Sequence, residues 1–146
     1  MNKYPIRAKL FFAGVRFTGI FNMSAPEGNT GVKRIINAFF FSLDGFKACF
    51  RTEEAFRQEI YLTALMVPTA FWIGDTNVEQ IVLLGSVVLV LITEMINTAI
   101  ERAIDRISTD KHELSKEAKD MGSAVVFMAL VFCAFTWLMI AIPKFF

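Results

Sequence analysis

Apolar residues follow two patterns along the chain, and both predict helices. Between Val32 and Arg51 they recur every three or four positions, which is typical of a helix with one apolar face. Three later stretches, Ile60–Gly74, Gln80–Thr93 and Met121–Pro143, contain no charged residue. Only the last of these reaches the roughly 18–20 residues that a membrane-spanning helix needs.

The two shorter stretches can span a membrane only if charged neighbours enter it with them. The first would extend backward over Glu53, Arg57 and Glu59, and the second forward over Glu94 and Glu101. Carboxylates inside a membrane are costly and indicate a functional site. The alternative is a soluble protein with two short buried helices.

These patterns predict an all-α membrane protein with an N-terminal amphipathic surface helix and three transmembrane helices. We expect residues 1–31 to be a poorly ordered or surface-lying extension, because Ser24–Gly31 is rich in turn and linker residues. Residues 32–146 would form one membrane domain. It would hold a surface helix over 32–51 and spans over about 54–73, 78–106 and 115–142.

The composition supports this class: 55% of the residues are hydrophobic and 20% are charged, against about 45–50% and 25% in soluble domains. The net charge of +1 argues against a nucleic-acid partner. Residues 1–52 carry eight Lys/Arg and two acids, which predicts a cytoplasmic N-terminus and, after three spans, an outside C-terminus. Neither a P-loop nor a protein-kinase glycine loop occurs in the sequence.

One face of the second predicted span is polar. It carries Glu94, Asn97, Thr98, Glu101 and Asp105, at helical offsets 0, 3, 4, 7 and 11. At 1.5 Å per residue, Glu94 lies about 21 Å along the helix from Gln80, within a hydrocarbon core about 30 Å thick. Glu101 lies about 10 Å further, near the headgroups. We expect Glu94 to meet a lipid headgroup, and Glu101 to meet a water-soluble, metal-bound partner.

A second group of charges, Glu53, Glu54, Arg57 and Glu59, begins the first predicted span. A magnesium site needs one or two carboxylates plus phosphate oxygens. Glu53 and Glu101 are expected at matching depth, where they could converge on one ion.

Three strings in this region resemble the bacterial integral-membrane diacylglycerol kinase family: Glu53–Glu59 (EEAFRQE), Glu94–Arg106 (EMINTAIERAIDR) and His112–Ala124 (HELSKEAKDMGSA). The resemblance extends from about Lys33 to Trp137. It implies a homotrimer in the bacterial inner membrane that transfers the γ-phosphate of ATP to diacylglycerol, giving phosphatidic acid, with Mg²⁺ as cofactor.

The same resemblance implies a role for individual residues. The catalytic residues would be Glu94, the general base, and Asn97, and the metal carboxylates would be Glu53 and Glu101. Contacts to ATP would come from Arg34, Phe41, Glu53, Glu101, Asp110, Lys111, His112, Lys119 and Asp120. Contacts to the lipid substrate would come from Arg34, Ala38, Ser42, Arg57, Gln58, Glu59, Glu94 and Ser123.

Two positions depart from the family pattern. A tyrosine that often precedes the serine at Ser42 is Phe41 here, and an aromatic residue that often follows it is Leu43. Both departures concern the nucleotide pocket and leave the proposed chemistry unchanged.

Three other functions stay open at this point. A related small membrane kinase could phosphorylate a polyprenol such as undecaprenol. An ion-coupled transporter could use Glu94 as a relay, although the sequence shows no inverted repeat of the kind common in transporters. The third alternative is a membrane scaffold without enzymatic activity.

Overall fold

The computed structural model describes residues 31–107 and 112–145, and their only regular elements are four helices. These are α1 (Val32–Thr52), α2 (Glu54–Ile73), α3 (Asn77–Ile107) and α4 (Glu113–Phe145). The prediction of an all-α protein is confirmed for these residues. The extension predicted for residues 1–31 lies, apart from Gly31, outside them.

The chain divides into two units, Met1–Phe41 and Ser42–Phe146. The described part of the first unit is Gly31, whose φ of 62° suits glycine, followed by the beginning of α1. Its large apolar side chains, including Val32, Ile35 and Phe39, are exposed. An exposed apolar stripe with basic neighbours is the pattern expected of a helix that lies on a membrane surface.

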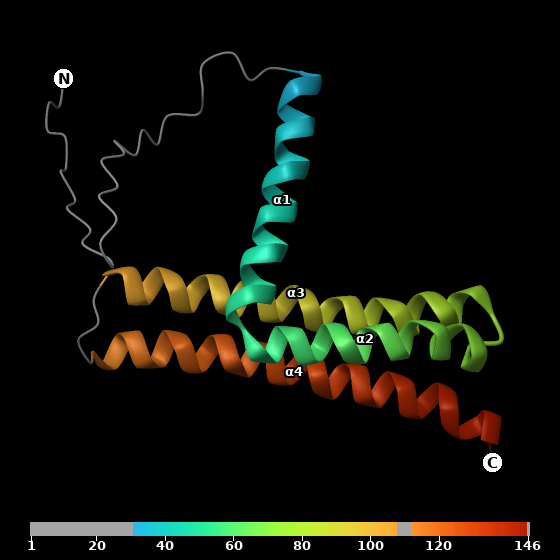
Figure 1. The fold of residues 1–146 in the computed structure, drawn as a ribbon. Helices are drawn as coiled ribbons and strands as arrows, with labels where there is room; N and C mark the ends of the chain where they lie inside the picture. Colours follow the sequence, from blue (N-terminus) through green and yellow to red (C-terminus); the bar gives the residue numbers. More distant parts are fainter. Residues whose placement is uncertain (1–30, 108–111, 146) are drawn as a thin grey trace, which may run out of the picture. The chain divides into compact units, whose positions relative to one another are not determined.

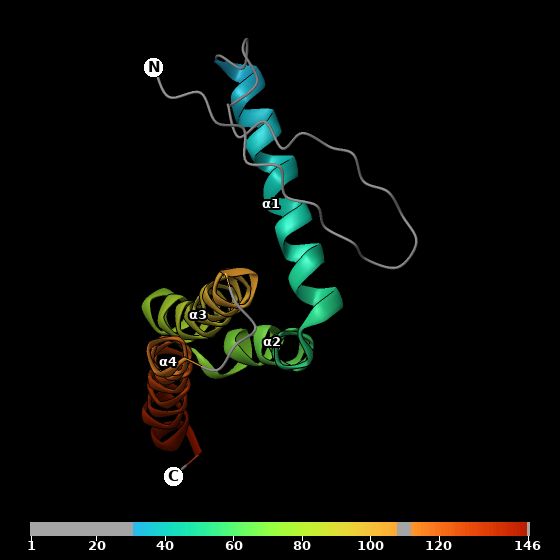
Figure 2. The same cartoon turned by 90° about the vertical axis from the view of Figure 1, so that its left-hand side faces the viewer.

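In the second unit α2, α3 and α4 run side by side, each antiparallel to the one before it (Figure 1). The view along the helices shows their three ends grouped together (Figure 2). Helix α3 packs most extensively on α4 and next on α2, whereas α2 and α4 contact each other little. Most of the packing in this bundle therefore involves α3.

Two apolar clusters hold this bundle together. One contains Val87 and Val90 of α3 with Ala129 and Cys133 of α4. The other joins Ala70 and Ile73 of α2 to Leu83 of α3, and the half-buried Trp137 packs against both clusters. The small residues among them, Ala70, Ala129 and Cys133, let the helices approach closely, as small residues commonly do in membrane helices.

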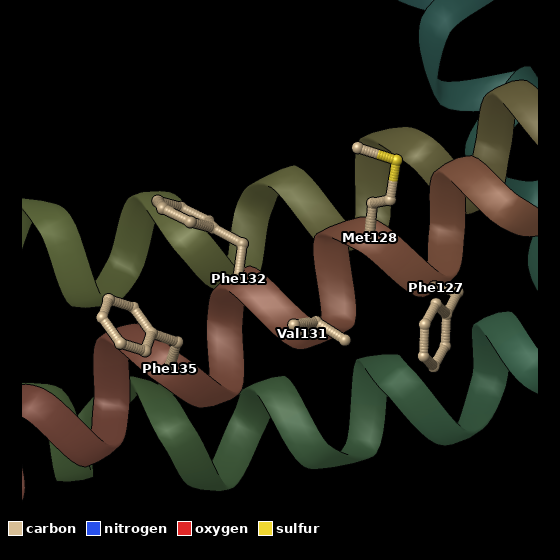
Figure 3. Close-up of a pocket in the computed structure, with 5 residues that line it drawn as sticks. All are labelled: Phe127, Met128, Val131, Phe132 and Phe135. Carbon is tan, nitrogen blue, oxygen red and sulfur yellow. The ribbon is translucent and has the colours of Figure 1, made fainter.

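Two of the helices, α3 and α4, are long and apolar enough to cross a membrane. Most of their apolar side chains are exposed, whereas the core helices of a soluble protein are mostly buried. Figure 3 shows one such surface, an apolar groove on α4 lined by Phe127, Met128, Val131, Phe132 and Phe135. Helix α2 is not apolar enough over its length to count with them, because Glu54, Arg57 and Glu59 occupy its first two turns.

Helix α4 extends beyond the position where the sequence predicted its end. It continues through Pro143 to Phe145, because a proline within the last turn removes only one terminal hydrogen bond. This brings Lys144 to the turn between α2 and α3. Its ammonium group donates to the carbonyls of Trp72 and Ile73 and pairs with Asp75 at 2.6 Å.

The turn between α2 and α3 is fixed by local capping. Thr76 and Glu79 form a capping box: Glu79 Nα donates to the Thr76 hydroxyl, and Glu79 Oε2 accepts from Asp75 and Thr76. Gly74 leaves no room for a Cβ, which would lie 2.8 Å from Gln80 Cγ. We call Gly74, Asp75, Thr76, Glu79, Gln80 and Lys144 the turn end.

Candidate active site

The polar face of α3 points into the bundle. Glu94, Asn97 and Thr98 are buried, with 8%, 9% and 6% of their surface exposed. Glu101 is half-buried, and Asp105 is exposed and pairs with Lys119 of α4 at 2.6 Å. The predicted face therefore divides in two, because only Glu94, Asn97 and Thr98 are buried.

Asn97 contacts both Glu101 on its own helix and Gly122 of α4. Its Nδ2 donates to Glu101 Oε1 at 3.1 Å, which orients that carboxylate. Its Oδ1 is buried and has no hydrogen-bond partner among the described residues. The same oxygen lies against Gly122 of α4, where a Cβ would collide with it. A larger residue at position 122 would therefore displace the Asn97 side chain or separate α3 from α4 at this point.

Glu53 lies at the break between α1 and α2. Its backbone is extended, with φ −105° and ψ 120°, and its side chain makes no capping bond to α2. The carboxylate pairs instead with Arg102 of α3, where Nη2 lies 3.2 Å from Oε1. Arg102 also donates to the hydroxyl of Thr52.

Four carboxylates gather in this part of the second unit. Glu53 and Glu101 both lie close enough to Glu94 to interact with it electrostatically, and Glu94 interacts in the same way with Glu59 of α2. Glu59 Oε2 is buried and has no hydrogen-bond partner in residues 31–107 and 112–145. We call Glu53, Glu59, Glu94, Asn97, Glu101 and Arg102 the polar cluster.

The polar cluster suits a magnesium ion that brings its own phosphate ligands. Within the described residues no three metal-ligating side chains gather around one point, so a cage made only of protein is not formed there. Mg²⁺ commonly takes one or two carboxylates and completes its shell with phosphate oxygens and water. The half-buried carboxylates of Glu53 and Glu101 and the unpartnered Asn97 Oδ1 are hard oxygen donors that fit this chemistry.

Other predicted residues of the second unit have partners of their own. Arg57 Nη1 donates to the carbonyls of Phe50 and Arg51 and so caps the end of α1. Gln58 contacts Glu54, Asp120 pairs with Lys116, and the Ser123 hydroxyl donates to the Lys119 carbonyl. His112 Nδ1 accepts from the Leu114 amide at the start of α4.

The remaining predicted contacts fall elsewhere. Arg34, Ala38 and Phe41 belong to the first unit, and Ser42 begins the second. Asp110 and Lys111 lie outside the described residues. The structure thus gathers Glu53, Glu59, Glu94, Asn97 and Glu101.

Sequence reasoning missed Arg102, Thr52 and Gly122. Arg102 directly follows Glu101, and Thr52 directly precedes Glu53, so each neighbours an expected metal carboxylate. That adjacency was the available signal, but the pairing joins residues 50 positions apart and depends on how α3 packs beside the α1–α2 break.

Comparison with known proteins relates this arrangement to one family. The family model for prokaryotic diacylglycerol kinase matches residues 40–141. A diacylglycerol kinase of Haemophilus influenzae is 44% identical over 108 residues, which cover 74% of this chain and 92% of that protein. Diacylglycerol kinases of Pseudomonas aeruginosa and Escherichia coli K12 are 47% and 43% identical over 111 residues, covering 76% of this chain and 90% and 91% of theirs. The chain therefore belongs to the prokaryotic diacylglycerol kinase family.

Proposed function

We propose that this chain transfers the γ-phosphate of ATP to the primary hydroxyl of 1,2-diacylglycerol, giving phosphatidic acid, at the cytoplasmic face of the bacterial inner membrane. The observation that carries the proposal is the buried carboxylate of Glu94, set beside two further carboxylates in a member of this family. Phosphoryl transfer needs mainly positioning and charge neutralisation.

Glu94 is the general base in this proposal. Its carboxylate takes the proton of the lipid hydroxyl, and the hydroxyl oxygen forms a bond to the γ-phosphorus while the opposite bond from that phosphorus to ADP breaks and ADP leaves. The burial of Glu94 in α3 keeps bulk water away from its carboxylate. Asn97 acts beside it by holding Glu101 through the 3.1 Å bond.

Glu53 and Glu101 would hold Mg²⁺ together with the phosphates of ATP. When bound, the ion neutralises negative charge on the transferring phosphate. The two carboxylates come from separate elements, the α1–α2 break and α3, so nucleotide binding would depend on the packing between them.

The other assignments remain part of the proposal. ATP would also contact Arg34, Phe41, Asp110, Lys111, His112, Lys119 and Asp120. The lipid would contact Arg34, Ala38, Ser42, Arg57, Gln58, Glu59 and Ser123. Lys119 is already beside an acid, Asp105, so it would have to exchange that partner for a phosphate oxygen.

We further propose the membrane arrangement. Helix α1 would lie on the cytoplasmic surface, and α2, α3 and α4 would each span the bilayer, with the N-terminus inside and the C-terminus outside. Residues 32–146 would form the kinase domain, assembled as a homotrimer. The exposed apolar surfaces of α3 and α4 support contact with lipid or with neighbouring copies.

The test is transfer of radiolabelled γ-phosphate from ATP to a panel of lipid alcohols by the purified protein. We expect label in dioleoylglycerol and a higher kcat/KM for it than for undecaprenol. A higher kcat/KM for undecaprenol would reassign the substrate and keep the chemistry. An absence of label in every lipid would contradict the proposed kinase activity and favour a transporter or a scaffold.

A further inference from the structure

Arg102 occupies an unusual place for a basic residue, because it adjoins Glu101 in sequence and pairs with Glu53, the two acids expected to bind a cation. Its side chain follows Glu101 on α3 and reaches across to Glu53 Oε1, 3.2 Å away. The same nitrogen donates to the Thr52 hydroxyl. That hydroxyl also lies 3.1 Å from Glu53 Oε1 and 2.9 Å from the Ala48 carbonyl.

This contact is poorly explained as a support for the fold. The side chains of Arg102 and Glu53 are 45% and 31% exposed, and exposed ion pairs add little to stability. Each contact that the described residues make to the Glu53 carboxylate uses Oε1. The pair thus places a positive charge on the carboxylate that the proposed function assigns to a divalent cation.

We propose that Arg102 is a positioning residue of the cation site: it acts as an internal counter-cation of Glu53 and sets how tightly that site binds a divalent cation before the nucleotide arrives. This inference rests on the role given to Glu53 in the proposed function. In the pair, the negative charge of Glu53 is balanced and its side chain is held at the α1–α2 break. An entering cation meets the repulsion of the guanidinium, so its affinity in the absence of nucleotide is low.

The experiment measures Mn²⁺ binding to the full-length purified protein by electron paramagnetic resonance, with no nucleotide present. The variants are Arg102→Met, Glu53→Gln and the double variant. We expect Arg102→Met to lower the Kd for Mn²⁺ about two- to five-fold, the range that a half-exposed ion pair allows. Glu53→Gln should raise the Kd, and the double variant should bind as Glu53→Gln does.

Two further variants separate a local effect from a change in net charge. Arg106→Met removes the same charge one helical turn away, at an exposed position of α3, and should leave the Kd unchanged. Arg102→Lys keeps the charge and should bind Mn²⁺ as the wild type does. Arg102→Gln, which keeps a donor for Thr52, replaces the methionine variant if the latter unfolds.

The outcomes distinguish the proposed role of Arg102 from the proposed metal-binding role of Glu53. An unchanged or higher Kd in Arg102→Met, beside a raised Kd in Glu53→Gln, overturns the role of Arg102 and leaves the cation site standing. An equal shift in Arg106→Met also overturns it. An unchanged Kd in Glu53→Gln removes both the role of Arg102 and the metal role of Glu53.

Discussion

The polar cluster and the turn end both contain charged groups, but they use them differently. At the turn end Lys144 contacts two carbonyls and a carboxylate, and Glu79 accepts from two backbone amides. In the polar cluster Glu59 Oε2 and Asn97 Oδ1 are buried without a partner among the described residues. Four carboxylates lie close enough there to interact electrostatically, and one of them, Glu53, pairs with Arg102.

This difference suits a structural role for the turn end and a ligand-binding role for the polar cluster. Buried polar groups are normally hydrogen-bonded, and an unpaired one costs about 1–3 kcal/mol. The turn end satisfies this rule within one chain, which is what a structural closure requires. The polar cluster violates it, as sites that await a ligand commonly do.

The largest effect is expected from Glu94→Gln. Loss of a general base typically lowers the rate by about 10²–10⁴, while the amide keeps the size of the side chain. Steady-state kinetics should show the loss in kcat with little change in KM for either substrate. A variant that keeps more than a tenth of its turnover would remove Glu94 from the chemistry.

A smaller effect on both activity and stability is expected from Gly122→Ala. The added Cβ collides with Asn97 Oδ1, so α3 and α4 must separate or Asn97 must move and release Glu101. Overpacking of this kind costs about 1–3 kcal/mol, and we expect about a tenfold loss of kcat/KM.

Gly85→Ala is the matched control for that substitution. Gly85 lies within α3, and apart from its chain neighbours and the nearby α3 backbone no described atom lies within 4 Å of a Cβ placed there. Alanine should raise stability by about 0.5–1 kcal/mol through helix propensity and leave activity unchanged. Thermal midpoints and turnover of the two variants test this, and equal losses in both would show that the contact with Asn97 is unimportant.

Lys144→Met should affect the turn end alone. It removes the charge that caps the last carbonyls of α2 and pairs with Asp75. Because Asp75 is exposed, we expect a loss of only about 1 kcal/mol. The thermal midpoint should fall by a few degrees with turnover unchanged below it; a loss of turnover at low temperature would extend the active region to this end.

The smallest effect concerns Cys49, which is buried beside the polar cluster and donates to Thr98. Burial raises the pKa of its thiol above the ordinary value, and the bond to Thr98 opposes part of that rise. A raised pKa in the folded state gives stability that is complete below the unfolded pKa and is lost as pH rises through the folded one. The difference in thermal midpoint between the wild type and Cys49→Ala should therefore shrink as the pH rises above about 9. A difference that grows with pH would contradict this environment for Cys49.

The helices could be read from the sequence because each carries its own signal. Hydrophobic periodicity marked α1, and charge-free runs marked α3 and α4. The shared face of Glu94 and Asn97 could also be predicted, and the structure buries both side chains on it.

What the sequence could not supply were contacts between distant segments. The pairing of Arg102 with Glu53, the fit of Asn97 against Gly122 and the cap by Lys144 all depend on how one helix lies against another. Arg57 shows the same limit: the family resemblance implies a contact with the lipid, but it gave no sign that the side chain also caps the carbonyls at the end of α1.

The most direct test makes the same substitution at two positions of α3, one in its first turn and one near its middle. Glu94→Gln and Glu79→Gln remove equal charge from the same helix, and both variants are assayed for phosphate transfer to dioleoylglycerol and for thermal midpoint. We expect Glu94→Gln to lose transfer and to melt at or above the wild-type temperature, because it relieves repulsion from Glu53 and Glu101. Glu79→Gln should keep transfer and melt at or slightly below it, because its capping oxygen loses charge. Retained transfer in Glu94→Gln, or an equal loss in both variants, would contradict the division between a catalytic polar cluster and a structural turn end.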